Sequence, residues 1–139
     1  MKKQAKILVV EDHEPTAMLL AVLLTRAGCS VEVASNGKKA MQLAHKGHFQ
    51  LITLDVDLPD VSGFEIFVRL RKNPSSSTTP ILFISGRSDE TNWRRGIELG
   101  AVDYIEKPFG GPAFTRRILS HLKITLSNNL PVPSTEDQK

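Results

Sequence analysis

Residues 7–12 read Ile7-Leu8-Val9-Val10-Glu11-Asp12, an uninterrupted apolar run that ends in two carboxylates. A strand with one face in water alternates apolar and polar residues, whereas a strand covered on both faces does not. The run therefore predicts a buried strand of a parallel sheet. Because charged residues follow it directly, we expect Glu11 and Asp12 at the carboxyl end of that strand.

The same unit, a short apolar run followed by an amphipathic stretch, repeats along the chain. Further strands are predicted at 31–34, 51–54, 81–84 and 104–106, and helices at 15–27, 38–45, 64–72, 89–99 and from 112 to about 122. Strands that alternate with helices are typical of an α/β fold, a doubly wound parallel sheet with helices on both faces. We expect this domain in residues 1–126 and a flexible C-terminal tail in residues 127–139.

The composition excludes several other classes of protein. The chain has 139 residues, of which 40% are hydrophobic, and its single cysteine, Cys29, excludes an internal disulfide framework and suits a reducing compartment. No apolar run approaches the roughly 20 residues of a membrane span, so we expect no membrane contact and a cytoplasmic location. The net charge is only +3, and the basic residues lack a helix-turn-helix pattern or interleaved aromatics, so direct binding of nucleic acid is not expected.

Polar side chains directly follow four of the five predicted strands. Glu11-Asp12, Asp55, Ser85 and Lys107 follow the first, third, fourth and fifth apolar runs. In an open parallel sheet, ligands bind at the carboxyl ends of the strands. One polar residue at a strand end needs no function, but three carboxylates facing one lysine favour a binding site.

These positions carry a resemblance to a known family. Four segments, 9–12 (VVED), 54–59 (LDVDLP) with Gly63, 84–86 (ISG) and 100–109 (GAVDYIEKPF), are similar in order and spacing to the receiver domain of bacterial response regulators. The resemblance covers about residues 5–124. It implies the flavodoxin-like strand order 2-1-3-4-5 and a cis peptide bond between Lys107 and Pro108.

The resemblance also assigns roles to the polar residues. Asp55 would be the phosphoacceptor, whose carboxylate attacks the phosphohistidine of a sensor histidine kinase or histidine phosphotransfer protein. Mg²⁺ would be held by Glu11, Asp12, Asp55 and the backbone carbonyl of Asp57, which are the oxygen ligands that this ion prefers. Together with Lys107, the divalent ion would balance the three carboxylates.

A conformational switch is the second implication. Ser85 would bond the phosphoryl group, and Tyr104 would change between an outward and an inward rotamer. In this family the fourth helix, fifth strand and fifth helix form the signalling face for a downstream protein target, and Trp93, Arg94, Arg95 and Tyr104 fall on these elements. The same face could also support a homodimer.

Asp57 and Arg87 form a further candidate pair, and four histidines need an interpretation. Asp57 and Arg87 lie two residues past Asp55 and Ser85, and we expect them to pair across the pocket mouth and modulate access of water or small phosphodonors. Independent, solvated side chains are the alternative, because exposed ion pairs are weak. His13 is interpreted as an exposed turn residue rather than a metal ligand, and His45, His48 and His121 as surface histidines.

Three functional interpretations remain open. The first is a stand-alone receiver: a signalling protein and not an enzyme, which catalyses only its own phosphorylation and slow dephosphorylation. The second is a haloacid-dehalogenase-like phosphatase that uses Asp55 and Asp57, although in that family the nucleophile normally ends the first strand. The third is the receiver fragment of a larger regulator or hybrid kinase.

Overall fold

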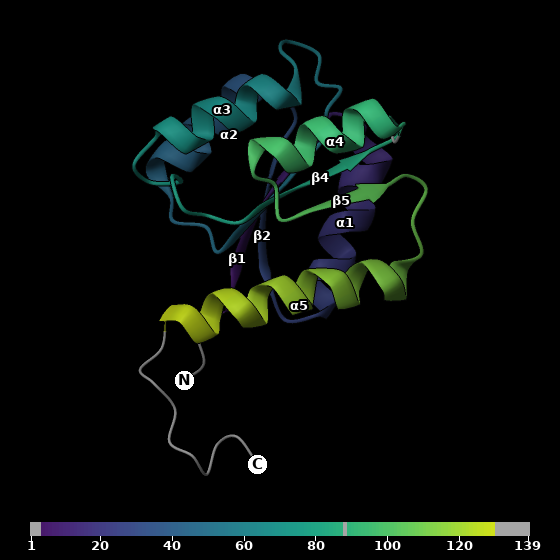
Figure 1. The fold of residues 1–139 in the computed structure, drawn as a ribbon. Helices are drawn as coiled ribbons and strands as arrows, with labels where there is room; N and C mark the ends of the chain where they lie inside the picture. Colours follow the sequence, from purple (N-terminus) through teal and green to yellow (C-terminus); the bar gives the residue numbers. More distant parts are fainter. Residues whose placement is uncertain (1–3, 88, 130–139) are drawn as a thin grey trace.

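The structure, a computed structural model, describes residues 4–87 and 89–129 (Figure 1). Five strands and five helices alternate along the chain, with these bounds: β1 Lys6–Val10, α1 Glu14–Arg26, β2 Ser30–Ala34, α2 Gly37–Lys46, β3 Leu51–Leu54, α3 Gly63–Lys72, β4 Ile81–Ser85, α4 Glu90–Leu99, β5 Asp103–Glu106 and α5 Gly111–Asn129. The predicted alternation is confirmed, and most of the predicted bounds are right to within one or two residues.

The strands form one parallel sheet in the order β2-β1-β3-β4-β5. This confirms the predicted α/β class and the strand order. Strand β1 lies between β2 and β3, and its uninterrupted run Ile7–Val10 is almost completely buried. A strand of this kind is covered by helices on both faces, which explains why it does not alternate.

Two hydrophobic clusters lie on opposite faces of the sheet. Leu8 and Val10 face a cluster that contains the buried residues of α2 and α3. Ile7 and Val9 face the second cluster, with the buried residues of α1 and α5. Figure 1 accordingly shows α2, α3 and α4 on one side of the sheet and α5 on the other. Successive residues of β1 thus point to different helical layers.

The last helix is longer than predicted. It continues to Asn129, three residues into the segment expected to be a tail. Residues 130–139, the rest of that predicted tail, lie outside the described residues. Within the described residues, no helix is long and apolar enough to cross a membrane. The peptide bond between Lys107 and Pro108 is cis, as predicted.

Candidate functional site

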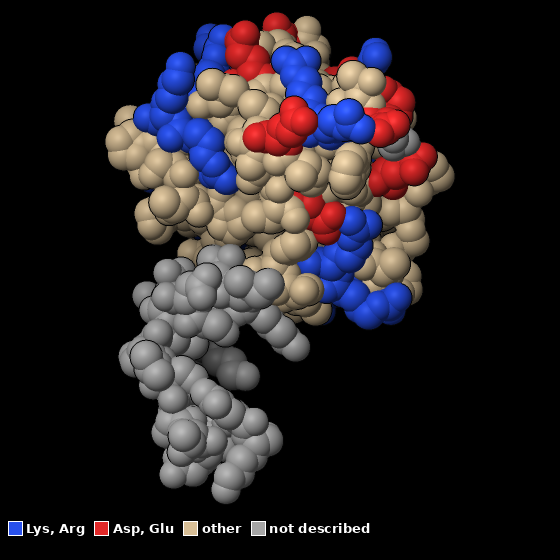
Figure 2. Space-filling view, viewed as in Figure 1, with Lys and Arg blue, Asp and Glu red and all other residues tan. Residues whose placement is uncertain are grey.

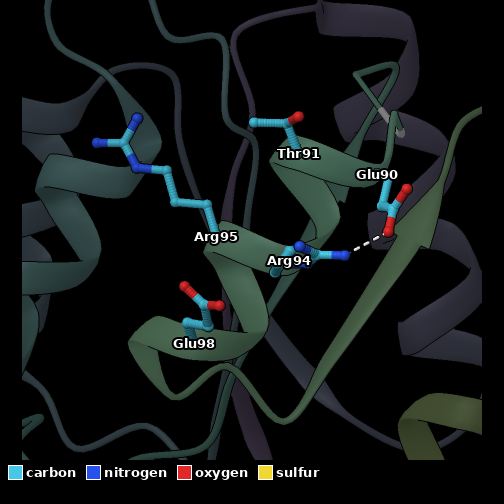
Figure 3. A pocket seen from close by; sticks show the side chains of 5 residues that line it. All are labelled: Glu90, Thr91, Arg94, Arg95 and Glu98. Atoms are coloured by element: carbon cyan, nitrogen blue, oxygen red, sulfur yellow. Dashed lines mark hydrogen bonds and ion pairs between the residues drawn. The ribbon is translucent and has the colours of Figure 1, made fainter.

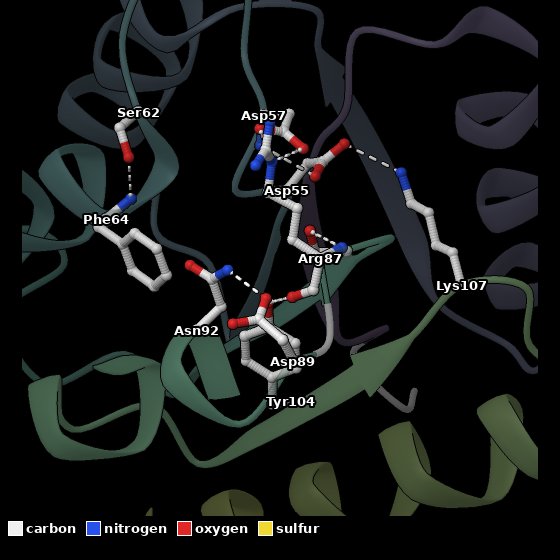
Figure 4. Close-up of polar contacts among 10 residues, drawn as sticks. Asp55, Asp57, Ser62, Phe64, Arg87, Asp89, Asn92, Tyr104 and Lys107 are labelled. Carbon is white, nitrogen blue, oxygen red and sulfur yellow. Dashed lines mark hydrogen bonds and ion pairs between the residues drawn. The ribbon is translucent and has the colours of Figure 1, made fainter. Parts of the chain in front are cut away.

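Four parallel strands deliver the predicted polar residues to one edge of the sheet. Glu11 follows β1, Asp55 follows β3, Ser85 ends β4 and Lys107 follows β5. Because parallel strands end at the same side, their polar end residues converge although up to 96 residues separate them along the chain. Figure 4 shows Asp55, Asp57, Arg87 and Lys107 gathered around this edge.

Lys107 joins two of the carboxylates. Its Nζ lies 2.6 Å from Oε1 of Glu11 and 2.9 Å from Oδ2 of Asp55, to which it donates a hydrogen bond. The side chains of Glu11 and Asp55 are only 1% and 7% exposed, whereas that of Lys107 is 21% exposed. A buried carboxylate is costly unless it is paired, so the Lys107 ammonium offsets part of the cost of burying these two side chains.

The pKa values record this competition between burial and pairing. Burial raises the pKa of Glu11, the hydrogen bond from Lys107 partly offsets that rise, and the Asp55 carboxylate adds to it. For Lys107, burial alone would lower the pKa, but the hydrogen bonds to Glu11 and Asp55 outweigh it and raise the pKa. Lys107 is therefore charged at neutral pH, and its hydrogen bond to Glu11 is the largest contribution that lowers the pKa of that acid.

The carboxylates of Glu11, Asp12 and Asp55 form a cluster that can hold a metal ion. One oxygen atom from each residue lies within 4.8 Å of the others. Glu11 and Asp55 are buried and Asp12 is exposed, so the cluster opens to solvent on one side. Three carboxylates against the single ammonium of Lys107 leave an excess of two negative charges. The donor set therefore fits a hard divalent cation such as Mg²⁺.

The backbone around Asp55 is held by a close approach of helix α3. A Cβ atom at Gly63 would lie 2.0 Å from the carbonyl oxygen of Asp55, which only a glycine permits. The Gly63 N–H also donates to the carbonyl of Val56, and the Asp57 N–H donates to Oδ1 of Asp55 at 3.1 Å. Gly63 was predicted only as part of the family motif. Its steric role could not be inferred, because it depends on where the helix meets the strand end.

Arg87 occupies the loop between β4 and α4 and contacts three parts of the site. Its Nε lies 2.7 and 2.9 Å from the two carboxylate oxygens of Asp57. Its backbone N–H donates to Oγ of the buried Ser85 at 3.1 Å, and its carbonyl accepts a hydrogen bond from the Tyr104 hydroxyl. The structure thus brings Asp57 and Arg87 together, and one residue touches the pocket mouth, Ser85 and Tyr104.

Tyr104 points inward. It is 5% exposed, and its ring lies 5.8 Å from that of Phe83 on the neighbouring strand. The ring enters the cluster between the sheet and the helices α2, α3 and α4. This is the inward one of the two positions that the family resemblance implies for Tyr104, and the change between them stays a prediction.

Helix α4 presents a mixed surface. Trp93 is 48% exposed, and Arg94 pairs with Glu90. Figure 3 shows Arg95 extending away from this pair, and its guanidinium lies 4.4 Å from the centre of the Phe64 ring. Figure 2 shows basic side chains in separate groups with acidic ones between them, so the face in view has no continuous patch of one sign.

The four histidines do not behave alike. His13, His45 and His48 are exposed, which confirms their interpretation, and His13 contacts the Thr16 hydroxyl at 2.7 Å. His121 is only partly exposed: its side chain is 20% exposed, and Nε2 lies 3.0 Å from Oδ2 of Asp103. The sequence did not reveal this contact, because Asp103 lies on β5 and His121 lies 18 residues later on α5.

Comparison with known proteins agrees with this geometry. The model of the response regulator receiver domain family matches residues 7–119 of the chain. Transcriptional regulatory protein SrrA of Staphylococcus aureus is 34% identical over 125 residues, which are 90% of this chain and 51% of SrrA. The chain thus spans about half the length of the curated relatives it matches.

Solved structures give the same result. A putative response regulator from Chloroflexus aurantiacus is 32% identical, with a TM-score of 0.82 over 87% of this chain and 99% of that one. A CheY-like receiver domain protein from Methanospirillum hungatei has a TM-score of 0.84 over 91% of this chain and 99% of that one, and at 22% identity it shows the fold alone. The family match over residues 7–119 and the strand order therefore agree, and we conclude that the chain belongs to the response regulator receiver domain family of two-component systems.

Proposed function

We propose that this chain accepts a phosphoryl group on Asp55 from the phosphohistidine of a sensor histidine kinase or a histidine phosphotransfer protein. The observation that carries the proposal is the convergence of Lys107, Glu11 and Asp55 at the carboxyl edge of the sheet. Asp12 completes the carboxylate cluster there. The family match and the relatives favour this function over a haloacid-dehalogenase-like phosphatase that uses Asp55 and Asp57.

The proposed reaction is an in-line displacement at phosphorus. A carboxylate oxygen of Asp55 forms the new O–P bond, the P–N bond to the donor imidazole breaks, and its electron pair leaves with the imidazole nitrogen. Phosphoryl transfer needs positioning and charge stabilisation more than covalent assistance. Lys107 already donates a hydrogen bond to Asp55, so its ammonium can also donate one to an oxygen of the incoming phosphoryl group.

A divalent ion completes the charge balance. Mg²⁺ held by Glu11, Asp12, Asp55 and the Asp57 backbone carbonyl would supply positive charge that stabilises the phosphoryl oxygens. Without it, the excess of carboxylates over ammonium in the pocket would repel an anionic phosphoryl group. The protein's own part is to balance part of the carboxylate charge with Lys107 and to orient Asp55 through the Asp57 N–H and the approach of Gly63.

The response to phosphorylation is proposed to run through Ser85 and Tyr104. The Ser85 hydroxyl would bond a phosphoryl oxygen, and the loop that begins at Ser85 carries Arg87, whose N–H and carbonyl meet Ser85 and Tyr104. A change at Ser85 would therefore alter the acceptor of the Tyr104 hydroxyl. The downstream protein is proposed to bind the face of α4, β5 and α5, and a homodimer through that face is a second use.

The phosphodonor protein is proposed to dock on α1. Met18, Leu19 and Val22 are large apolar side chains exposed on this helix. Leu19 also lines a surface pocket together with Lys107 and Phe109, so the apolar strip reaches the edge of the phosphorylation site. A donor protein bound along this strip would lie beside Lys107. A cytoplasmic location, which suits the free Cys29, is part of this proposal.

Phosphotransfer with Mg²⁺ and a phosphodonor tests the proposal. We expect one stoichiometric label per chain, stable in acid and labile in base, as an acyl phosphate is. Without Mg²⁺ the label should form much more slowly. Repeated turnover of small phosphate esters would instead establish the phosphatase. The same assay applies unchanged if the chain is the receiver part of a larger regulator or hybrid kinase.

The pair of Asp57 and Arg87 gives a separate prediction about the lifetime of the label. We expect Arg87→Ala to shorten it about two- to fivefold, because an exposed ion pair contributes roughly 0.2–1 kcal/mol and this one lies at the pocket mouth. The measurement is the decay of the isolated phosphorylated protein. Arg69→Ala, which removes an exposed pair with Glu65 on α3, is the matched control and should leave the decay unchanged. An unaltered lifetime in Arg87→Ala would contradict the role.

A further inference from the structure

The loop between β3 and α3 carries Asp57, whose backbone carbonyl is a proposed metal ligand. A loop carbonyl is useful as a ligand only if the loop is held in place. At the Gly63 end, the loop is fixed by the close approach to Asp55. What holds its middle is a contact with a helix that has no residue in the site.

That contact is made by Asp60 at the start of helix α2. Oδ1 of Asp60 accepts the Gly37 N–H at 2.9 Å, and Oδ2 accepts the Lys38 N–H at 3.0 Å. Both carboxylate oxygens are therefore used on two successive backbone donors of the first turn. These hydrogen bonds hold the pKa of Asp60 below its usual value, with the bond from Gly37 the largest contribution, so the carboxylate is ionised at neutral pH.

Apolar packing supports the same contact. A Cβ atom at Gly37 would lie 2.6 Å from Cγ1 of Val61 and 2.7 Å from Cδ1 of Ile66. The absence of a side chain at Gly37 lets the loop and α3 lie directly against the backbone of α2. Loop and helix thus meet through two hydrogen bonds and a close steric fit.

Helix α2 has a cap of its own. The Asn36 side chain accepts the Lys39 N–H at 2.7 Å, which is the usual arrangement at a helix start. Asp60 reaches the same turn from 23 residues away and takes different donors. The two residues therefore stabilise one helix end, but only Asp60 ties it to the loop that carries Asp57.

We infer that Asp60 is a positioning residue for the phosphorylation site, holding the β3–α3 loop against α2 so that the Asp57 carbonyl faces the carboxylate cluster. The inference rests on the proposed function for the role of that carbonyl. Asp60 acts through the loop and touches neither the metal nor the phosphoryl group. Mutation of a residue that orients a metal ligand without touching the metal typically lowers metal affinity about 10- to 100-fold.

The test compares Asp60→Ala with Asn36→Ala. Both remove a cap from the first turn of α2, so both should lower the melting temperature by a similar amount. Titration with Mg²⁺ alone, followed by calorimetry, should show about tenfold weaker binding for Asp60→Ala and binding within twofold of wild type for Asn36→Ala. In the metal-free proteins, the backbone amide resonances of Asp55 and Asp57 should move only in Asp60→Ala.

Each outcome decides one of the two proposals. Wild-type affinity and unmoved resonances in Asp60→Ala would overturn the inference, as would an equal loss of affinity in Asn36→Ala. If the wild-type protein itself does not bind Mg²⁺, the proposed function fails, and the amide resonances alone decide whether Asp60 positions the loop. If Asp60→Ala does not fold, Asp60→Asn, which keeps one oxygen acceptor, should give an intermediate loss of affinity.

Discussion

Asp55→Asn is expected to abolish the phosphoryl label completely. The amide has nearly the shape of the carboxylate, and its single oxygen can still accept one of the two hydrogen bonds, from Lys107 or from the Asp57 N–H, so the fold should persist. It cannot act as the nucleophile, because the neutral amide oxygen carries no negative charge and cannot form an acyl phosphate. The measurement is incorporation of phosphate from a small phosphodonor with Mg²⁺, at equal protein concentration.

The control for this variant is Asp103→Asn. Asp103 begins β5 at the opposite end of the sheet and pairs with Arg117 and His121, so it is a partly buried, ion-paired aspartate without a place in the site. It should be labelled like the wild-type protein. If Asp55→Asn and wild type are labelled equally, another residue is the acceptor and the assignment of the site is wrong.

The sequence was enough to predict the sheet and its functional edge, because both depend on short-range patterns. An apolar run such as Ile7–Val10 predicts a buried strand, and the residue that follows it must lie at the strand's carboxyl end. The parallel arrangement then brings Glu11, Asp55 and Lys107 together whatever their separation along the chain. Their contacts in the structure follow from this rule.

Contacts that depend on how whole elements pack could not be predicted. The bond between His121 and Asp103 requires the rotation of α5 over β5, which no local pattern encodes. The contact of Asp60 with α2 requires the loop after β3 to turn toward that helix, and Asp60 itself looked like an ordinary turn residue. Which of its two implied positions Tyr104 takes likewise depends on packing, here against Phe83 on β4.

The second large effect is expected for Lys107→Met, which keeps the length of the side chain and removes its charge. Phosphotransfer should fall about 100-fold or more, the usual loss when one charge-stabilising donor is removed from a reacting group. The donor here is the Nζ of Lys107, which lies 2.9 Å from Asp55. Initial rates of labelling at saturating Mg²⁺ measure the effect. Labelling within threefold of wild type would contradict it.

The same variant should be less stable at neutral pH. Removing one partner of a buried ion pair costs roughly 3–5 kcal/mol, and partial exposure reduces that cost. Because Lys107 is 21% exposed, we expect a loss of about 2 kcal/mol in the free energy of unfolding at pH 7.5 without Mg²⁺. Lys6→Met is the matched control: its ion pair with Glu32 is more than one-third exposed on both sides, so its loss should be within about 0.5 kcal/mol.

The pH dependence of this loss identifies its cause. In the wild-type protein the pKa of Glu11 is already raised above its ordinary value of 4.5, and Lys107 is the main group that holds it down. Without Lys107 the pKa of Glu11 must rise further, so the folded variant takes up a proton at a higher pH than the wild type. A carboxyl group with a raised pKa in the folded state contributes stability when it is protonated and loses that contribution as the pH rises through the folded pKa.

The difference in stability between wild type and Lys107→Met should therefore be largest near pH 7.5 and shrink steadily toward pH 5, as measured by urea unfolding. A difference that stays constant over this range would mean that protonation of Glu11 does not account for the loss of stability.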